Sequence, residues 1–250
     1  MGGSTVLTVI SLFISFTSAR PPPDYYNFSP QNTLRDDLFT SIELRHLSVG
    51  YKTARQQLFG YLFLKGLSFE TYSITTTYCQ LPITNNDLSA GSPLAPMQIP
   101  DYQIVNTEHS WPQSKFSPDF SDSLQKGDLH NLFPELSKVN SLRKNHPYGI
   151  VVSGANSPCP GAALGKSVTG RTVFEPHDFV KGNVARALFY FSVRYKHAID
   201  TEQEDTLRQW HTQDPIDVDE ETHNDQVFLI QNNRNPFIDN PAWVEQIQDF

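Results

Sequence analysis

The stretch NTEHSWPQS, residues 106–114, places a carboxylate beside an imidazole at the end of an extended segment. Neighbouring side chains of a strand point to opposite faces, so a regular strand would separate Glu108 from His109. A bend at Pro112 would instead aim both side chains into one cleft. Two interpretations follow: a metal ligand beside a general base, or two polar residues of the surface.

Two polar blocks follow this pair, GDLHNLFP at residues 127–134 and KVNSLRKN at residues 138–145. We expect a strand over residues 102–109, then a loop, then a short helix over residues 133–145 that carries Asn140. A carboxylate and an amide oxygen suit Mg²⁺, and a nearby neutral imidazole can take a proton from an attacking water. The pattern therefore supplies the parts for phosphodiester hydrolysis with one metal ion.

Each of these residues alone also has an ordinary structural explanation. A helix Asn is usually a surface or capping residue, and a lone Glu-His pair is usually solvated. His130 is expected to brace its loop through hydrogen bonds more often than to take part in a reaction. Only the combination points to catalysis.

The N-terminus reads as a targeting segment. VLTVISLFISF, residues 6–16, is apolar and is followed by the small residues TSA, and it is shorter than the roughly 20 residues that span a bilayer. We expect a signal peptide over residues 1–19 and a secreted, extracellular mature domain over residues 20–250. The alternative is a buried N-terminal helix or strand. No other long apolar run follows, so we expect no membrane span in the mature form.

The chain has 250 residues, 38% of them hydrophobic, which suffices for one well-buried domain. It has two cysteines, Cys79 and Cys159, which form either one disulfide or two buried free thiols. No CxxC motif or closely paired histidines accompany them, so they are not a zinc site.

Charge is distributed unevenly along the sequence. The net charge is -8, which taken whole argues against a nucleic-acid binder. Residues 108–196 nevertheless hold 11 Lys or Arg against 7 acids, whereas residues 197–250 hold 2 against 13. The basic excess lies in the part that contains the Glu-His pair, so a polyanionic substrate is not excluded.

The remaining patterns alternate between helical and extended periodicity, which predicts an α+β fold. Helical spacing covers residues 37–62 with a break near Gly50, then 178–197, 201–213 and 214–234; a strand is expected over 71–79, short strands and turns over 146–176, and loops over 80–100 and 114–130.

The chain resembles the endonuclease I family of secreted or periplasmic nucleases, which includes extracellular ribonucleases. The resemblance covers most of residues 50–243. It is carried, in order, by YKTARQQLFG, TYCQ, NTEHSWPQS, GDLHNLFPELSKVNSLRKN, FEP, KGNVARALFYFSVRY, LRQWHTQDPID and QNNRNPFIDNP. So many separated blocks in one order are far more specific than a single short motif.

This resemblance implies a ββα-metal (His-Me finger) core within a mostly helical single α+β domain. It implies that His109 is the general base and that Glu108 and Asn140 hold one Mg²⁺, with Ca²⁺ and Mn²⁺ as alternatives. The implied activity is sequence-nonspecific endonuclease cleavage of DNA, RNA or both, which leaves 5′-phosphate ends. We expect a monomer, and a fall in activity below a pKa near 6.5 unless the site shifts the pKa of His109.

Several positions depart from the family pattern or stay open. Some members have a cysteine before the Glu-His pair where this chain has Thr107, and some have an acid ahead of the D-x-H-N block where it has Lys126 and Gly127. A metal-bound water or Lys126 would then supply the proton for the leaving group. Other candidate supporting residues, including those for neutralising the phosphate, are Lys115, Asp128, His130, Arg143 and Lys144; the block around Arg234 is expected to be structural.

Two other classes of function remain as alternatives. The first is an inactive relative, a secreted nucleic-acid-binding or interaction protein, which the acidic segment over residues 197–250 would favour if it lined the groove. The retention of Glu108, His109 and Asn140 speaks against it. The second is a hydrolase that uses paired carboxylates on sugars, which nothing but the abundance of Asp and Glu supports.

Overall fold

The computed structural model describes residues 21–68, 71–89 and 91–250. The expected signal peptide, residues 1–19, lies outside the described residues. The described elements are α1 (Leu34–Glu43), α2 (Tyr51–Gln57), the π-helix η1 (Leu58–Leu62), β1 (Lys65–Ser68), β2 (Thr71–Thr75), β3 (Pro82–Thr84), η2 (Asn85–Asp87), β4 (Val105–His109), η3 (Gln113–Lys115), α3 (Asp122–Lys126), η4 (Leu129–Asn131), β5 (Leu132–Leu136), α4 (Ser137–Arg143), β6 (Ser153–Cys159), β7 (Ala162–Lys166), β8 (Thr172–Glu175), η5 (Asp178–Val180), α5 (Lys181–Arg194), α6 (Thr201–Gln213), α7 (Val218–Gln231), α8 (Pro236–Asp239) and α9 (Trp243–Gln246).

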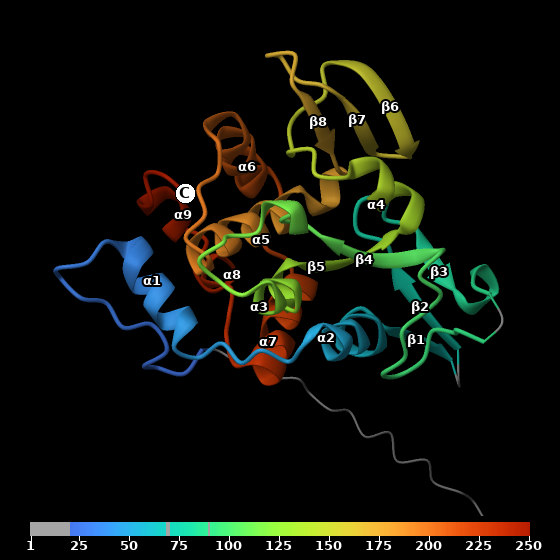
Figure 1. Cartoon of the computed structure of the whole chain (residues 1–250), viewed down its shortest axis with the longest axis horizontal. Coiled ribbons are helices and arrows are strands. Elements are labelled where there is room, and N and C mark those ends of the chain that lie inside the picture. The colour runs from blue at the N-terminus through green and yellow to red at the C-terminus, as the bar shows by residue number, and fades with distance from the viewer. Residues whose placement is uncertain (1–20, 69–70, 90) are drawn as a thin grey trace, which may run out of the picture.

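The strands form three small antiparallel sheets, β1-β2-β3, β4-β5 and β6-β7-β8. In Figure 1 the pair β4-β5 lies near the middle of the molecule, with β6-β8 at the top and β1-β3 at the lower right. Helices α5 to α9 lie to the left of the pair in this view. The mixture of helices and small sheets confirms the α+β class.

Helix α5 forms the centre of the helical part. It packs against α6, α1 and α8. The helix is buried on all sides: Val184, Leu188, Tyr190 and Val193, which point in different directions around its axis, are each at most 1% exposed. A helix that is buried all round lies inside the domain, so the helix expected over residues 178–197 is a core helix, in which even Arg186 is buried.

The pair β4-β5 followed by α4 was predicted only in part. Residues 133–136 belong to β5 and not to the helix expected over residues 133–145. Within the pair, Thr107 lies opposite Pro134 and Glu108 opposite Phe133. The carbonyl of Pro134 faces away from β4 and accepts from the N–H of Thr77 at 2.9 Å. The missing N–H of Pro134 therefore costs no ladder hydrogen bond, which is why a proline is tolerated in this strand.

Three other element predictions need correction. The expected loop over residues 80–100 contains the short strand β3. The expected loop over residues 114–130 contains α3, which starts where the Ser121 side chain accepts from the N–H of Leu124 and so satisfies a free donor of the first turn. Helix α7 begins at Val218 with Asp217 as its N-cap, not at Asp214. The carboxylate of Asp214 instead accepts from the N–H of Gly182.

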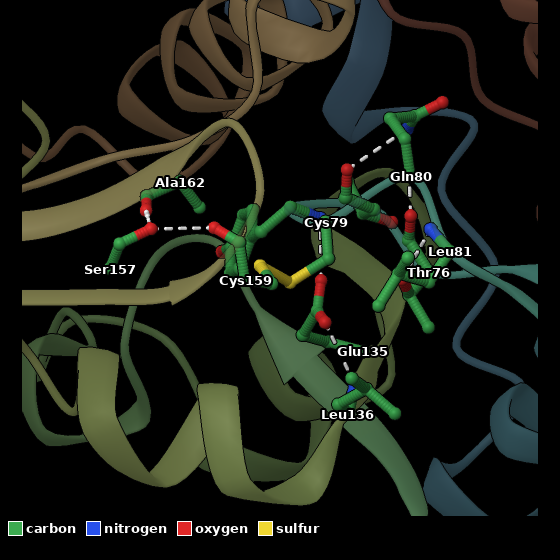
Figure 2. Close-up of a disulfide and its surroundings, with 11 residues drawn as sticks. Thr76, Cys79, Gln80, Leu81, Glu135, Leu136, Ser157, Cys159 and Ala162 are labelled. Atoms are coloured by element: carbon green, nitrogen blue, oxygen red, sulfur yellow. Dashed lines mark hydrogen bonds between the residues drawn. A yellow bond between two sulfur atoms is a disulfide. The ribbon is translucent and has the colours of Figure 1, made fainter.

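Cys79 and Cys159 form a disulfide with a Cα–Cα distance of 5.8 Å. It joins the turn after β2 to the end of β6, and the carboxylate of Glu135 in β5 lies beside it (Figure 2). The bond settles the choice between a disulfide and two free thiols in favour of the disulfide.

Among the described helices, none combines the length and apolar character needed to cross a membrane.

Candidate active site

The Glu-His pair opens onto a polar pocket of about 490 Å³ at the end of β4. Its lining comes from α2, β4, the turn that follows β4, and α4. The lining residues are Tyr51, Asn106, Thr107, Glu108, His109, Pro112, Gln113, Ser114, Asn140, Lys144 and Asn145. None of them belongs to the acidic segment over residues 197–250, which therefore does not line this pocket.

Glu108 is held at the back of the pocket and is only 2% exposed. Its Oε1 accepts from the hydroxyl of Tyr78 at 2.8 Å and from Nη1 of Arg143 at 2.8 Å. Burial raises the pKa of Glu108 to about 7, although Arg143 and the Tyr78 hydrogen bond oppose the rise. The protein thus holds this carboxylate in a position where a further positive charge would be favourable.

His109 has one ring nitrogen fixed by the backbone. Its Nε2 lies 3.1 Å from the carbonyl of Lys126, and because a carbonyl only accepts, Nε2 carries the proton and donates. The Nδ1 atom therefore carries no proton and is an acceptor, and Nε2 of Gln113 donates to it at 3.3 Å. Burial lowers the pKa of His109 to about 4, so the imidazole is neutral at ordinary pH and the expected fall of activity moves from 6.5 toward 4.

Asn140 projects from α4 into the same pocket. Its Nδ2 donates to the carbonyl of Thr107 at 3.0 Å, which leaves Oδ1 as the atom available to a ligand. The pocket therefore offers a carboxylate from Glu108 and an amide oxygen from Asn140. Within the described part of the chain, no group of three or more His, Cys, Asp or Glu could hold a metal ion. Two oxygen donors with room for water fit Mg²⁺ or Ca²⁺ and not a closed zinc site.

The structure places two predicted supporting residues away from the pocket. Asp128 is buried and accepts from the hydroxyls of Tyr190 and Tyr195, each at 2.8 Å. Burial opposes ionisation of Asp128, but nearby His46 and His130, together with hydrogen bonds from Gln231 and Tyr195, outweigh it and lower its pKa. His130 points its Nε2 toward the carbonyl of Asn233 at 3.2 Å. These contacts tie the D-x-H-N block to α5 and to the segment after α7.

The predicted cations lie in different settings around the pocket. Arg143 is 1% exposed and stands behind the pocket, where it also donates to the carbonyls of His109 at 3.0 Å and Ser110 at 2.7 Å. Lys144 lines the pocket. The ammonium of Lys126 lies 4.7 Å from the ring centroid of Tyr51.

A second pocket, of about 280 Å³, adjoins the first at Pro112. Lys115, His146 and Arg143 are among its lining residues. Burial lowers the pKa of Lys115, and the charges of Arg143 and Arg171 add to the effect.

Sequence reasoning missed four aromatic and amide side chains of the site. Tyr78 holds Glu108, and Tyr148 contacts both Tyr78 and Arg143. Tyr51 packs on His109 with ring centroids 5.7 Å apart, and Gln113 reaches its Nδ1. Three of the four lie in blocks that carried the family resemblance, Tyr78 in TYCQ, Tyr51 in YKTARQQLFG and Gln113 in NTEHSWPQS, so these blocks held a signal that was not used.

Residues 74–242 match the family model described as Endonuclease I. The match covers well over half of the chain and includes β4, β5 and α4. The chain belongs to the endonuclease I family, as its sequence blocks predict.

Three relatives give the range of this similarity. The chain is 36% identical over 161 residues to an extracellular ribonuclease of Bacillus amyloliquefaciens. The aligned segment covers 57% of this chain and 53% of the relative. The chain is 32% identical over 114 residues to an extracellular deoxyribonuclease of Aeromonas hydrophila, covering 46% and 50%. It is 24% identical over 143 residues to an Endonuclease-1 of Buchnera aphidicola, covering 56% and 58%. The chain spans about half the length of the curated relatives it matches.

Proposed function

We propose that this protein is a secreted, metal-dependent endonuclease that hydrolyses phosphodiester bonds of DNA, RNA or both without base preference. The observation that carries the proposal is the hydrogen bond from Nε2 of His109 to the carbonyl of Lys126, at 3.1 Å. It leaves Nδ1 as a neutral acceptor in a pocket that Glu108 and Asn140 also line. A base and two oxygen ligands in one pocket are the parts that this hydrolysis needs.

Glu108 and Asn140 would hold one divalent cation, preferably Mg²⁺ and alternatively Ca²⁺ or Mn²⁺. When bound, the cation would neutralise charge on the phosphate and on the departing oxygen. The free Oδ1 of Asn140 and the buried carboxylate of Glu108 support this assignment, because hard cations prefer carboxylate and amide oxygens. We propose that β4, β5 and α4 together form the ββα-metal core implied by the family resemblance.

In the proposed reaction, His109 Nδ1 takes a proton from a water molecule, whose oxygen attacks the phosphorus. The bond from phosphorus to the 3′-oxygen breaks, which gives a 5′-phosphate end and a 3′-hydroxyl end. The hydrogen bond to Lys126 holds the imidazole in the required tautomer. Gln113 donates to Nδ1 in this structure, and the attacking water would take its place.

Cations near the pocket are candidates for the remaining roles. Lys126 is the candidate proton donor to the leaving oxygen, and Tyr51 links it to His109 through contacts with both. Lys144 lines the pocket and Lys115 the adjoining one, so we assign phosphate contacts to these two lysines. Arg143, which is buried and bonded to Glu108, is assigned a supporting role behind the pocket.

Two observations support secretion of this protein into an oxidising compartment. The disulfide between Cys79 and Cys159 is typical of secreted and periplasmic proteins. Among the relatives, the Bacillus amyloliquefaciens and Aeromonas hydrophila enzymes are named as extracellular. Secretion is therefore part of the proposal.

The alternative, an inactive protein on the same fold, loses its main argument in this structure. It relied on an acidic segment that would repel polyanions from the groove. Residues 197–250 supply no lining residue of the pocket, and several of their acids pair with arginines, among them Glu204 with Arg208 and Glu220 with Arg186.

The test uses the mature chain from Arg20, incubated with plasmid DNA and with total RNA, with Mg²⁺ or with EDTA. We expect degradation that requires the metal and is lost in the His109→Ala variant. The substrate that is degraded decides between DNA and RNA. No cleavage of either substrate by folded protein would reject the enzyme in favour of the inactive alternative.

A further inference from the structure

We propose that Tyr78 is a positioning residue for Glu108: its hydroxyl, placed by a backbone that β5 and the disulfide at Cys79 hold in position, fixes the carboxylate for metal binding. This inference rests on the proposed function, because it takes Glu108 as a metal ligand. Tyr78 lies in the block TYCQ but was not among the predicted site residues, and the structure brings it to the site.

The hydrogen bonds on Glu108 are unequally divided between its two oxygens. Both the Tyr78 hydroxyl and Nη1 of Arg143 donate to Oε1, each at 2.8 Å. In the described part of the chain, no hydrogen bond reaches Oε2. One oxygen is thus tied to the protein and the other is kept for a ligand, which fixes the rotation of the carboxylate.

The two tyrosines form a directed chain of hydrogen bonds. A phenol hydroxyl carries a single hydrogen. The hydroxyl of Tyr78 donates its hydrogen to Glu108, because a carboxylate can only accept. In the hydroxyl pair Tyr78–Tyr148 the donor must therefore be Tyr148. The ring of Tyr148 is held in turn by the guanidinium of Arg143, 4.4 Å from its centroid. Tyr148, Tyr78, Arg143 and Glu108 form one closed, buried group.

The backbone around Tyr78 is fixed on three sides, which a positioning role requires. The N–H of Thr77 donates to the carbonyl of Pro134 at 2.9 Å. The N–H of Tyr78 itself donates to the carboxylate of Glu135. The next residue, Cys79, is bonded to Cys159, and Figure 2 shows this disulfide beside Glu135. Strand β5 and the disulfide therefore fix the position from which the Tyr78 hydroxyl contacts Glu108.

The pair of tyrosines offers a matched control. The Tyr78→Phe variant removes the hydroxyl that contacts Glu108. Tyr148→Phe removes the other hydroxyl of this hydrogen-bond series, which does not contact Glu108. The double variant removes both and leaves no hydroxyl without a partner. It is therefore expected to fold even if Tyr78→Phe alone is destabilised by the orphaned hydroxyl of Tyr148.

The experiment is a calorimetric titration of Mg²⁺, and separately of Ca²⁺ and of Mn²⁺, into each EDTA-treated mature protein without substrate. We expect Tyr78→Phe and the double variant to bind about 10-fold more weakly than wild type, as is usual when a partner of a metal ligand is lost. Tyr148→Phe should stay within about 3-fold of wild type. In activity assays, excess Mg²⁺ should restore the kcat of Tyr78→Phe, which a merely misfolded protein would not show.

The outcomes separate the two proposals. If wild type binds the metal and the folded Tyr78→Phe and double variants bind equally well, Tyr78 has no positioning role and the proposed function stands. A loss of the same size in Tyr148→Phe also overturns the assignment, because the effect would then not depend on contact with Glu108. If wild type binds none of Mg²⁺, Ca²⁺ and Mn²⁺, the proposed function fails, and the role of Tyr78 fails with it.

Discussion

Nη1 of Arg143 lies 2.8 Å from Oε1 of Glu108, and the two side chains are 1% and 2% exposed. Together they form an ion pair in the interior, directly behind the pocket. Such a pair adds little net stability by itself, but removing one partner leaves the other charge buried without compensation.

We therefore expect the Arg143→Met variant to lose about 3 kcal/mol or more of unfolding free energy. Arg143→Lys should recover only part of it, since a lysine cannot also reach the carbonyls of His109 and Ser110 with a planar fork. Urea unfolding measures both variants. The control is the neighbouring, exposed Lys144→Met, expected within about 0.5 kcal/mol of wild type. A loss below 1 kcal/mol in Arg143→Met would show that Glu108 is compensated by other groups.

The role of His109 as base predicts a specific kinetic loss. His109→Ala should lower kcat by about 10²- to 10⁴-fold with folding unchanged, because the proton acceptor is gone. Gln113→Ala, which removes only the side chain that donates to Nδ1, should lower kcat by less than about 10-fold. Steady-state rates on a defined oligonucleotide decide the matter. Equal losses in the two variants would count against His109 as the base.

Lys144 combines a place in the pocket with an unfavourable backbone, since its φ is 52° and its ψ is -122°. Only glycine adopts this region without strain. Lys144→Gly should therefore raise the unfolding free energy by about 1 kcal/mol, while KM rises because a phosphate contact is lost. Lys144→Gln should show the same rise in KM with no gain in stability. If neither variant changes KM, Lys144 does not contact the substrate.

The disulfide should matter greatly for stability, because it joins residues 80 positions apart. In the chain-entropy model a loop of this length contributes about 4 kcal/mol. The Cys79→Ala/Cys159→Ala double variant should lose about this amount in chemical unfolding. Wild type treated with a reductant should lose the same amount, and the double variant should not respond to reductant. A reductant effect on the double variant would reveal that something other than this bond is being measured.

Stability should fall on mild acidification. Burial lowers the pKa of His130 to about 3, whereas in the unfolded chain it is near 6.5. Between these values the unfolded chain binds the extra proton, so stability is complete above pH 6.5 and is lost as the pH falls toward 3. For this one group the loss between pH 7 and 5 is roughly 2 kcal/mol.

The His130→Gln variant keeps a donor for the carbonyl of Asn233 but does not titrate. The difference in its unfolding free energy between pH 7 and 5 should be smaller than that of wild type by roughly the same 2 kcal/mol. An unchanged difference would show that His130 is not the group responsible.

Local patterns predicted those parts of the fold in which one periodicity dominates. Helix α6 occupies residues 201–213 as expected, since its Asp200 cap and regular spacing leave no competing structure. Residues 133–136 of β5 were expected to begin the helix over residues 133–145, and so short a segment with a proline has no clear strand periodicity of its own. What makes it a strand is the pairing with β4 and the contact of Pro134 with Thr77, both of which join distant parts of the chain.

The same limit applies to the site. Glu108, His109 and Asn140 were predicted because they lie in short motifs, close together in the sequence, whose residue types suit metal binding and proton transfer. Tyr78 and Tyr148 were missed, since Tyr78 lies 30 positions from Glu108 in the sequence and Tyr148 lies 70 positions from Tyr78. The buried state of Arg143 was also not predictable, because an arginine at the end of a short helix is usually exposed.

One further consequence follows from how α4 meets β4. The carbonyls of Thr107 and His109 lie on the edge of β4 that faces away from β5, and Asn140 and Arg143 donate to them. On the far side, the carbonyl of Pro134 in β5 is taken up by Thr77. A two-stranded ribbon with open edges invites pairing with another chain. Here the side chains beside the pocket also cover one edge, so the arrangement that would hold the metal ion also protects the strand pair from pairing with another chain.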